Sequence, residues 1–380
     1  MPIFFSILKN SFLKRKIIFF TILLALISAC KTDKEEKTQL SLGESITKYS
    51  NHLKIYEKTE GTYIHLIHPD QKNKRFLYFI PKSKKASPKE YIVLNTPIKS
   101  MVVYSSTHIG MLGELNQIKC IRGIKNRKYI HNKQVLNKVK TNEIIEFGEE
   151  SQVSFEKIIN SKAQMIIYSG FSDDFPKSNK LKKLGINCVP NFDWKESHPL
   201  GKAEWILLFG YLTGTEKQAK EYFKNLTKQY QHLTTLASKS KENEHVFSGN
   251  IIGDYWYAPG GKSFIAKIFK DASCSYKYST TNEKGSITMS FEKIFSDNKK
   301  SKFWFNSGYK NKTLIRQINP KSIHFDSYKT NNIYCYSHNS NKFWEISACH
   351  PEYVLSDIIQ ITHPEINLDK DLYFYKKVNE

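Results

Sequence analysis

The chain has 380 residues and a formal net charge of +22 at pH 7, and this length is enough for two domains with sizeable cores. Its lysines are scattered among Asn and Ser, whereas a nucleic-acid-binding surface would gather them into a patch or stripe. The charge therefore argues against a nucleic-acid partner, while a positive cleft for an anionic ligand stays compatible with it.

The N-terminus has the pattern of an export signal. Basic residues, the last of them Lys16, precede an uncharged stretch over 17–29 that is too short to span a bilayer comfortably. The stretch ends in Ile-Ser-Ala-Cys, which resembles a bacterial lipobox. We expect a signal peptide over 1–29, a lipid on Cys30 and a tether over 30–50. The alternative is an ordinary secretory signal in which the cysteine is incidental.

Residues 51–196 are expected to form an N-terminal lobe. Two apolar runs flank a polar turn and predict an antiparallel hairpin over 53–80, added at the edge of the lobe. Beyond the hairpin, strands alternate with helices, which is typical of a mainly parallel sheet covered on both faces. The expected strands cover 101–104, 119–121, 165–168 and 187–190. Three helices are expected: one that ends near residue 115, one over 150–159 and one over 179–184.

Residues 197–240 are expected to connect two lobes as a helix. Apolar residues recur at three- and four-residue steps from Trp205 to Ala237, the pattern of a helix with one buried face. Gly214 marks a break, and the run from Thr215 to Gln218 predicts a capping box that restarts the helix. The second piece, about 23 residues, would be a rod of roughly 35 Å, so we expect the lobes to rotate only slightly on binding.

Residues 241–365 repeat the alternation and predict a C-terminal lobe, followed by a packed tail over 366–380. The sequence Ser-Phe-Glu-Lys-Ile occurs at both 154–158 and 290–294, and each copy precedes an apolar run that ends in Ser-Gly. Two similar α/β halves joined by one long helix predict a cleft between the lobes. The expected strands of this lobe cover 245–250, 303–305 and 332–336; the expected helices cover 263–269, 291–295 and 353–361.

Aromatic residues crowd the expected strand ends, where ligands bind in doubly wound sheets. The alternative is that these rings fill the core between sheet and helices. Ser106, Thr107 and His108 follow the first strand of the N-terminal lobe in a loop that would line the cleft. The aromatic candidates are Phe171, Trp194, Tyr255, Trp256, Tyr257 and Trp344.

Catalytic and metal-binding motifs do not occur in the sequence. The run from Gly261 to Ser263 lacks the first glycine of a phosphate-binding loop, because Trp256 stands there. Neither G-x-S-x-G nor H-E-x-x-H is found, and the five cysteines after Cys30 have no metal-like spacing. We therefore expect no enzyme activity, no cofactor and no metal held by the protein itself.

Several ordered stretches between residues 98 and 365 together resemble the substrate-binding lipoproteins of ABC importers for iron complexes and cobalamin. The N-terminal hairpin and the C-terminal ending resemble the version found in Bacteroidetes-type bacteria. The stretches are SSTH at 105–108, VSFE at 153–156, LGI at 184–186, HPLGKAEW at 198–205, GDYWYAPGG at 253–261, WE at 344–345, HP at 350–351 and HPE at 363–365.

This resemblance implies two Rossmann-like lobes with mainly parallel sheets, joined by one long helix. It implies a non-enzymatic, monomeric protein, lipid-anchored and facing the periplasm, that carries a ferric siderophore, haem or cobamide to a permease and its ATPase. By position, Glu156 and Glu292 would dock onto arginines of the permease. The alternative is that both are first-turn carboxylates favoured by the helix dipole.

The ligand is left open by the resemblance. Arg127, after the second strand, is the expected cationic clamp on a carboxylate or siderophore oxygen, with Tyr129 beside it. Two other functions stay open as well. One is a surface lipoprotein that binds a macromolecule or acts in adhesion and whose cleft no longer binds a small molecule. The other is a binder of free metal ions through His108 and carboxylates.

Overall fold

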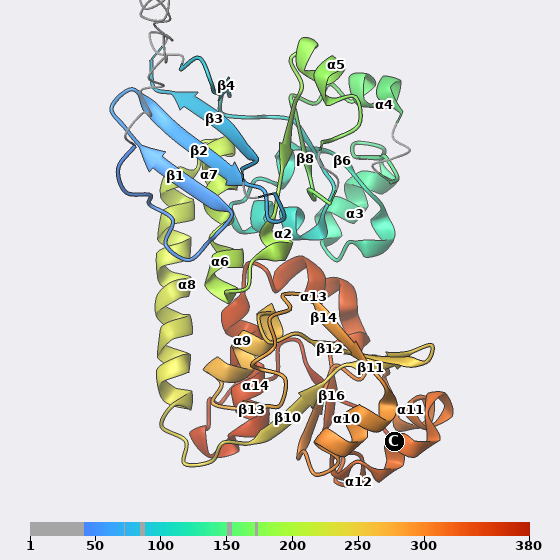
Figure 1. Ribbon diagram of the computed structural model, residues 1–380. Helices are drawn as coiled ribbons and strands as arrows, with labels where there is room; N and C mark the ends of the chain where they lie inside the picture. Colours follow the sequence, from blue (N-terminus) through green and yellow to red (C-terminus); the bar gives the residue numbers. More distant parts are fainter. Residues whose placement is uncertain (1–41, 72, 84–87, 150–153, 172–173) are drawn as a thin grey trace, which may run out of the picture. The chain divides into compact units, whose positions relative to one another are not determined.

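The computed structural model describes residues 42–71, 73–83, 88–149, 154–171 and 174–380. The chain divides into two compact units, Met1–Gly43 and Glu44–Glu380, and the second contains both predicted lobes (Figure 1). The expected signal peptide, Cys30 and most of the tether lie outside the described residues. Within those residues, no helix is both long and apolar enough to cross a membrane.

A four-stranded sheet opens the second unit. Its strands, in sheet order, are β1 (Leu53–Glu57), β2 (Gly61–Ile67), β3 (Arg75–Pro81) and β4 (Ile92–Val93). The antiparallel pairing of β2 with β3 confirms the predicted hairpin. The four strands form a sheet of their own. The hydroxyl of Tyr78 on β3 donates to the carbonyl of Cys188 at 3.3 Å, which fits the expected place at the edge of the N-terminal lobe. Ile55, Ile64 and Leu66 join one core with Met101 and Val103 of that lobe and with helix α7 (Ile206–Thr213).

The N-terminal lobe is built on a five-stranded parallel sheet. All residues of β5 and β8 are buried, as expected for strands covered on both faces. The strand expected at 119–121 is misplaced, because Ile118–Cys120 forms a 3-10 turn. In sheet order the strands are β7 (Ile145–Glu146), β6 (Ile121–Ile124), β5 (Met101–Val103), β8 (Met165–Tyr168) and β9 (Asn187–Pro190). The connecting helices are α2 (Ser106–Glu114), α3 (Lys133–Lys140), α4 (Phe155–Asn160) and α5 (Ser178–Lys183).

The C-terminal lobe has a second five-stranded sheet, parallel except for its last strand. In sheet order the strands are β13 (Ser275–Tyr276), β10 (His245–Ser248), β15 (Phe303–Phe305), β16 (Ile333–Cys335) and β17 (Lys376–Lys377). Its helices are α9 (Phe264–Asp271), α10 (Phe291–Asn298), α11 (Lys312–Ile318), α12 (Asp326–Lys329), α13 (Ser340–Ile346) and α14 (Pro351–Thr362).

The two parallel sheets confirm the predicted internal repeat. The order β6-β5-β8-β9 in the first sheet corresponds to β13-β10-β15-β16 in the second. In both copies of the repeated sequence a serine, Ser154 or Ser290, caps the helix by accepting a backbone N–H three residues on. The glycines that end the following apolar runs are left-handed in both copies, with φ of 59° at Gly170 and 79° at Gly308.

A three-stranded antiparallel sheet in the C-terminal lobe was not expected from the sequence. It consists of β11 (Asn250–Ile252), β12 (Tyr255–Pro259) and β14 (Ser286–Met289). Exposed and buried residues alternate along the first part of β12. Successive side chains of a strand point to opposite faces, so the aromatic run at 255–257 is divided between the core and the surface.

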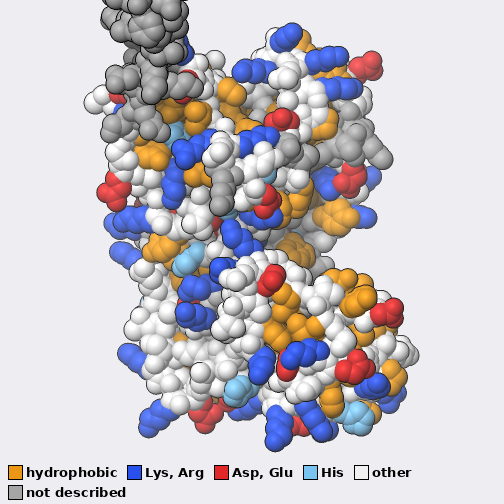
Figure 2. All heavy atoms as spheres, viewed as in Figure 1, with side chains coloured by type: hydrophobic (Ala, Val, Ile, Leu, Met, Phe, Trp, Pro, Cys, Tyr) orange, Lys and Arg blue, Asp and Glu red, His pale blue; other side chains and the backbone are white. Residues whose placement is uncertain are grey.

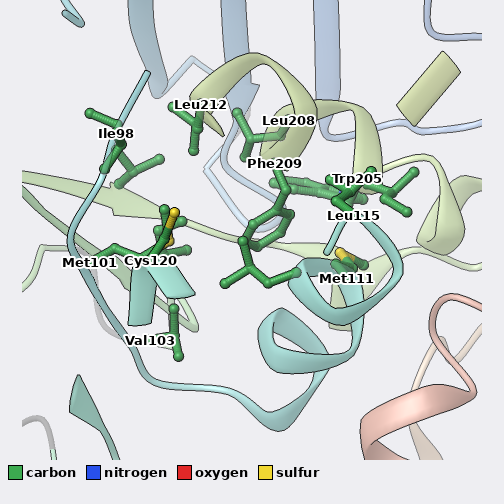
Figure 3. Packing of buried hydrophobic residues seen from close by; sticks show 14 of the residues in the cluster. Ile98, Met101, Val103, Met111, Leu115, Cys120, Trp205, Leu208, Phe209 and Leu212 are labelled. Carbon is green, nitrogen blue, oxygen red and sulfur yellow. The ribbon is translucent and has the colours of Figure 1, made fainter. Parts of the chain in front are cut away.

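The lobes are connected by α6 (Pro199–Ala203), α7 and α8 (Glu216–Ala237). Figure 1 shows α8 running along the side of both lobes. The predicted break is confirmed, since Gly214 is left-handed with φ 72°. The predicted capping box is wrong, because the Thr215 side chain caps no backbone N–H; its hydroxyl lies 2.9 Å from that of Thr213. Side chains of α7 point toward α2 and β5 in one continuous core (Figure 3).

Candidate functional site

A cleft lies at the carboxyl ends of the parallel strands of the N-terminal lobe. Segments that follow β5, β6, β8 and β9 form most of it, because these ends meet at one edge of the sheet; α6 and α13 complete it. Its volume of about 330 Å³ is at the lower end of small-molecule pockets. The lining residues are Val103, Tyr104, Ser105, Ser106, Thr107, Ile109, Ile124, Lys125, Asn126, Tyr129, Ile130, Ser169, Phe171, Asp193, Trp194, Lys202, Asn341 and Trp344.

The N-terminus of α2 forms one part of the cleft wall. Ser105 caps this helix, since its Oγ accepts a hydrogen bond from the N–H of Thr107 at 3.3 Å. The cap places the Ser106 and Thr107 side chains at the cleft. Hydroxyl groups beside the positive end of a helix suit an anionic or oxygen-bearing group of a ligand.

A pair of aromatic rings forms the next part of the wall. Phe171, after β8, lies 4.4 Å from Trp194, after β9, between ring centroids. Trp194 is fixed because its Nε1 donates to the carbonyl of Ser169 at 2.6 Å, and the Nζ of Lys195 lies 4.8 Å above its ring. Phe171 is 72% exposed. An exposed apolar ring held against a fixed one offers a flat surface for a conjugated part of a ligand.

The opposite part of the wall combines residues from both lobes. Tyr129 comes from the segment after β6, and Trp344 comes from α13; both are about half exposed. Trp344 packs edge-on against Phe343 at 5.3 Å and Tyr336 at 5.8 Å. Asn341, one turn before Trp344, donates from Nδ2 to the carbonyl of Lys128 at 2.8 Å.

Among the described residues that line the cleft, two lysines and one carboxylate supply the charge. Lys125 forms a 2.6 Å ion pair with Glu149, and the Nζ of Lys202 lies 5.3 Å above the ring of Phe264. Asp193 is only 3% exposed, and burial raises its pKa although Lys202 and the Thr107 hydroxyl oppose this. Sequence reasoning missed these residues. Lys125 and Asp193 could have been found because they follow the ends of β6 and β9, whereas Lys202 lies on a helix with no such signal.

Two residues predicted for the cleft lie outside its lining. His108 is fully buried, with its ring 5.6 Å from that of Phe209, and burial lowers its pKa to about 3. It points away from the loop face because it lies on the core side of α2. Arg127, the expected cationic clamp on a ligand, instead forms an ion pair with Glu146, with 2.9 Å between Nε and Oε2.

The aromatic run on β12 is also placed outside the lining. Trp256 is 1% exposed in the core of the C-terminal lobe, and its Nε1 donates to the carbonyl of Ser248 at 3.2 Å. Tyr255 and Tyr257 are exposed on the other face of the antiparallel sheet. Six other candidates are in the lining: Ser106, Thr107, Tyr129, Phe171, Trp194 and Trp344; their contact with a ligand stays a prediction.

Metal-ligating side chains do not gather in the part of the chain that the structure describes. No group of three or more His, Cys, Asp or Glu residues there could hold an ion. The five cysteines after Cys30 are free thiols. Among the described residues that line the cleft, none is His, Cys, Met or Arg.

A family model described as periplasmic binding protein matches residues 101–337, which is more than half of the chain. The chain belongs to the periplasmic binding protein family. This finding confirms the resemblance seen in the sequence, and the family consists of solute-binding proteins. The match begins at β5 and therefore leaves out the N-terminal four-stranded sheet.

Similar proteins are found both by sequence and by structure. A lipoprotein of Methanocaldococcus jannaschii is 26% identical over 76% of this chain and 70% of its own length. A periplasmic haem-binding protein of Vibrio cholerae has a TM-score of 0.54 at 14% identity, over 68% of this chain and 98% of that one. A siderophore-binding protein, solved with ferric iron and two acinetobactin molecules, has a TM-score of 0.55 at 14% identity, over 79% of this chain and 99% of that one.

The two glutamates expected to dock onto a permease occupy equivalent positions. Glu156 and Glu292 each stand in the first turn of a serine-capped helix, α4 or α10. Both are exposed, and Glu292 lies 3.5 Å from the Nζ of Lys321. Their local geometry fits docking and fits helix-dipole stabilisation, so the docking role stays a prediction.

Proposed function

We propose that this protein is the substrate-binding lipoprotein of an ABC importer. It captures a ferric siderophore, haem or cobamide in the cleft and delivers it to the permease. The observation that carries the proposal is the composition of the cleft, in which the Phe171–Trp194 pair stands with Tyr129 and Trp344 beside hydroxyl groups and lysines. Aromatic faces with nearby oxygen and nitrogen donors suit a large, part-conjugated ligand that carries oxygen atoms.

A ferric siderophore fits this cleft best among the three ligand classes. The iron of a siderophore is already surrounded by the ligand's own oxygens, so it needs no side chain from the protein. Haem commonly takes an axial His, Cys, Met or Tyr, and among the described lining residues only the phenols of Tyr104 and Tyr129 are of this kind. Tyr104 is 3% exposed. A cobamide is larger than the ligands that pockets of this size enclose.

The family, together with a relative that is named a lipoprotein, supports a place in the cell envelope, anchored through Cys30. In Cys30→Ala we expect fatty-acid labelling of the exported protein to be lost and the protein to be soluble or uncleaved. Metabolic labelling with a palmitate analogue measures this, with Cys120→Ala as the control that keeps the label. Equal labelling of Cys30→Ala would contradict the anchor.

Tryptophan quenching by a ferric tris-catecholate, haem and cyanocobalamin tests the ligand. We expect saturable quenching by the ferric chelate, and Trp194→Ala should weaken its affinity roughly tenfold, because a lost stacking ring costs on the order of 1–2 kcal/mol. Tyr255→Ala, which removes an exposed ring outside the cleft, is the matched control. Failure of all three compounds to bind, or equal effects of both variants, would contradict the proposal.

A further inference from the structure

Glu345 is a buried carboxylate that reaches from one lobe to the other. It lies on α13 and is 2% exposed. Its Oε2 accepts hydrogen bonds from the backbone N–H of His131 at 2.7 Å and of Asn132 at 3.2 Å. These two residues follow Tyr129 and Ile130 of the cleft wall and precede helix α3. A side chain of the C-terminal lobe therefore holds the backbone of the N-terminal lobe beside the cleft.

A second contact lies one helical turn away on the same face of α13. Asn341 donates from Nδ2 to the carbonyl of Lys128 at 2.8 Å. The segment 128–132 is thus attached to α13 before and after Tyr129. Trp344 lies between the two attachment points on α13. The two attachments therefore fix Tyr129 relative to Trp344.

Burying the Glu345 carboxylate is energetically unfavourable by itself, which indicates that its contact with the segment has a specific role. Burial raises the pKa of its carboxyl to about 7, although the hydrogen bonds from His131 and Asn132 oppose this. A buried carboxylate is favourable only when its oxygens are satisfied. Removing it would leave two backbone N–H groups without their acceptor, and an unsatisfied buried donor is destabilising. The segment would then be expected to move until water satisfies these groups.

We propose that Glu345 is a positioning residue for ligand binding, which fixes the segment carrying Tyr129 against α13 so that the two sides of the cleft are set before the ligand arrives. Its effect on affinity rests on the proposed function, whereas its effect on the segment does not. Fixing both sides in advance reduces the ordering cost of binding. In this role Glu345 acts through the segment that carries Tyr129.

Hydrogen exchange of the ligand-free protein tests the positioning directly. In Glu345→Ala, the amides of residues 128–135 should exchange roughly tenfold faster or more, while those of α8 stay protected. Glu345→Gln keeps one carbonyl acceptor and should restore part of the protection. The matched control is Asp271→Ala. Asp271 of α9 is also a buried carboxylate, and its Oδ2 accepts a hydrogen bond from the hydroxyl of Tyr230 on α8 at 2.7 Å.

Affinity for a ferric tris-catecholate tests the consequence for binding. Glu345→Ala should bind it roughly five- to tenfold more weakly, and Asp271→Ala should bind it like the unchanged protein. In a Tyr129→Ala background the Glu345→Ala change should add less than about twofold, because the two residues act through one contact. A purely structural role would weaken binding equally in both backgrounds.

The outcomes separate this inference from the proposed function. If the unchanged protein binds none of the three compounds, the proposed function fails, and hydrogen exchange still decides whether Glu345 fixes the segment. Unchanged exchange over 128–135 in Glu345→Ala overturns the inference. So does normal ligand affinity in a variant whose segment exchanges freely, and so does full additivity with Tyr129→Ala.

Discussion

At the scale of single residues, two glycines of α2 occupy different surroundings. A Cβ on Gly110 would lie 2.1 Å from the carbonyl oxygen of Glu345 on α13, a distance at which the backbones must move apart. A Cβ on Gly113 would meet its nearest atoms at 3.9 Å, which is an ordinary contact. Gly110 therefore permits α13 to lie close against α2, and Gly113 does not affect this packing.

Alanine at these two positions should have opposite effects on stability. Gly113→Ala should raise the free energy of unfolding by about 0.5–1 kcal/mol, because Ala favours a helix interior. Gly110→Ala should lower it by about 1–3 kcal/mol, because overpacking forces a backbone shift. Urea unfolding followed by circular dichroism measures both changes. Equal effects of the two substitutions would mean that α2 and α13 are not packed as described.

At the scale of elements, α2 joins the cleft to the junction of the lobes. Its N-terminus lines the cleft, and Glu114 at its C-terminal end lies 3.1 Å from Nε2 of His350. The other ring nitrogen, Nδ1, lies 2.7 Å from Glu352 of α14, and the hydroxyl of Tyr222 on α8 lies 3.0 Å from Nε2. Both ring nitrogens thus face carboxylates, to which the charged imidazole can donate from both nitrogens.

The charge on His350 predicts a loss of stability at alkaline pH. Burial by itself lowers its pKa, but the hydrogen bonds to Glu114 and Glu352 outweigh burial and raise the pKa to about 9. The unfolded value is about 6.5, so the stabilisation is complete below pH 6.5 and is lost as the pH rises through about 9. Its size is on the order of 3 kcal/mol.

Urea unfolding at pH 6.5 and pH 9.5 measures this loss. We expect the free energy of unfolding to fall between the two values in the unchanged protein and to fall much less in His350→Gln. His232→Gln provides the control, because His232 is an exposed histidine of α8 and its loss should leave the pH dependence unchanged. The same fall in His350→Gln as in the unchanged protein would show that another group is responsible.

At the scale of the whole molecule, the lobes share one topology and carry equivalent exposed glutamates. Lys and Arg side chains are spread over the face of the protein shown in Figure 2, with Asp and Glu side chains among them; the two glutamates are distinguished by their matching positions in the repeat. Opposite charges across an interface govern encounter and orientation, and their effect weakens with salt. Exposed single charges contribute little to folding.

The double change Glu156→Arg, Glu292→Arg should therefore keep ligand affinity and abolish uptake in cells. Uptake of the radiolabelled ferric chelate, corrected for the amount of protein in the envelope, measures the effect. Glu221→Arg, Glu242→Arg makes the same change of charge at two exposed positions outside the repeat and should leave uptake intact. Normal uptake by the first variant would contradict docking and would leave both glutamates as first-turn carboxylates favoured by the helix dipole.

The sequence by itself determined the parts of the fold that depend on local periodicity and on repetition. The alternation of strands and helices, the break at Gly214 and the internal repeat were predicted because short segments of the sequence encode them. Membership of the family followed from an ordered set of such segments. The position of aromatic residues after strand ends also placed Phe171 and Trp194 in the cleft, since the carboxyl ends of parallel strands meet at one edge.

The tertiary structure alone decided which side of an element each residue occupies and which distant segments meet. Neighbours on β12 divide between core and surface because the strand is antiparallel and half-buried, so Trp256 fills the core while Tyr255 is exposed. His108 points into the core, although Ser106 and Thr107, which precede it on α2, line the cleft. Glu345 meets His131 only because α13 packs against α2 across the lobes, a contact between residues 214 positions apart that no local pattern in the sequence encodes.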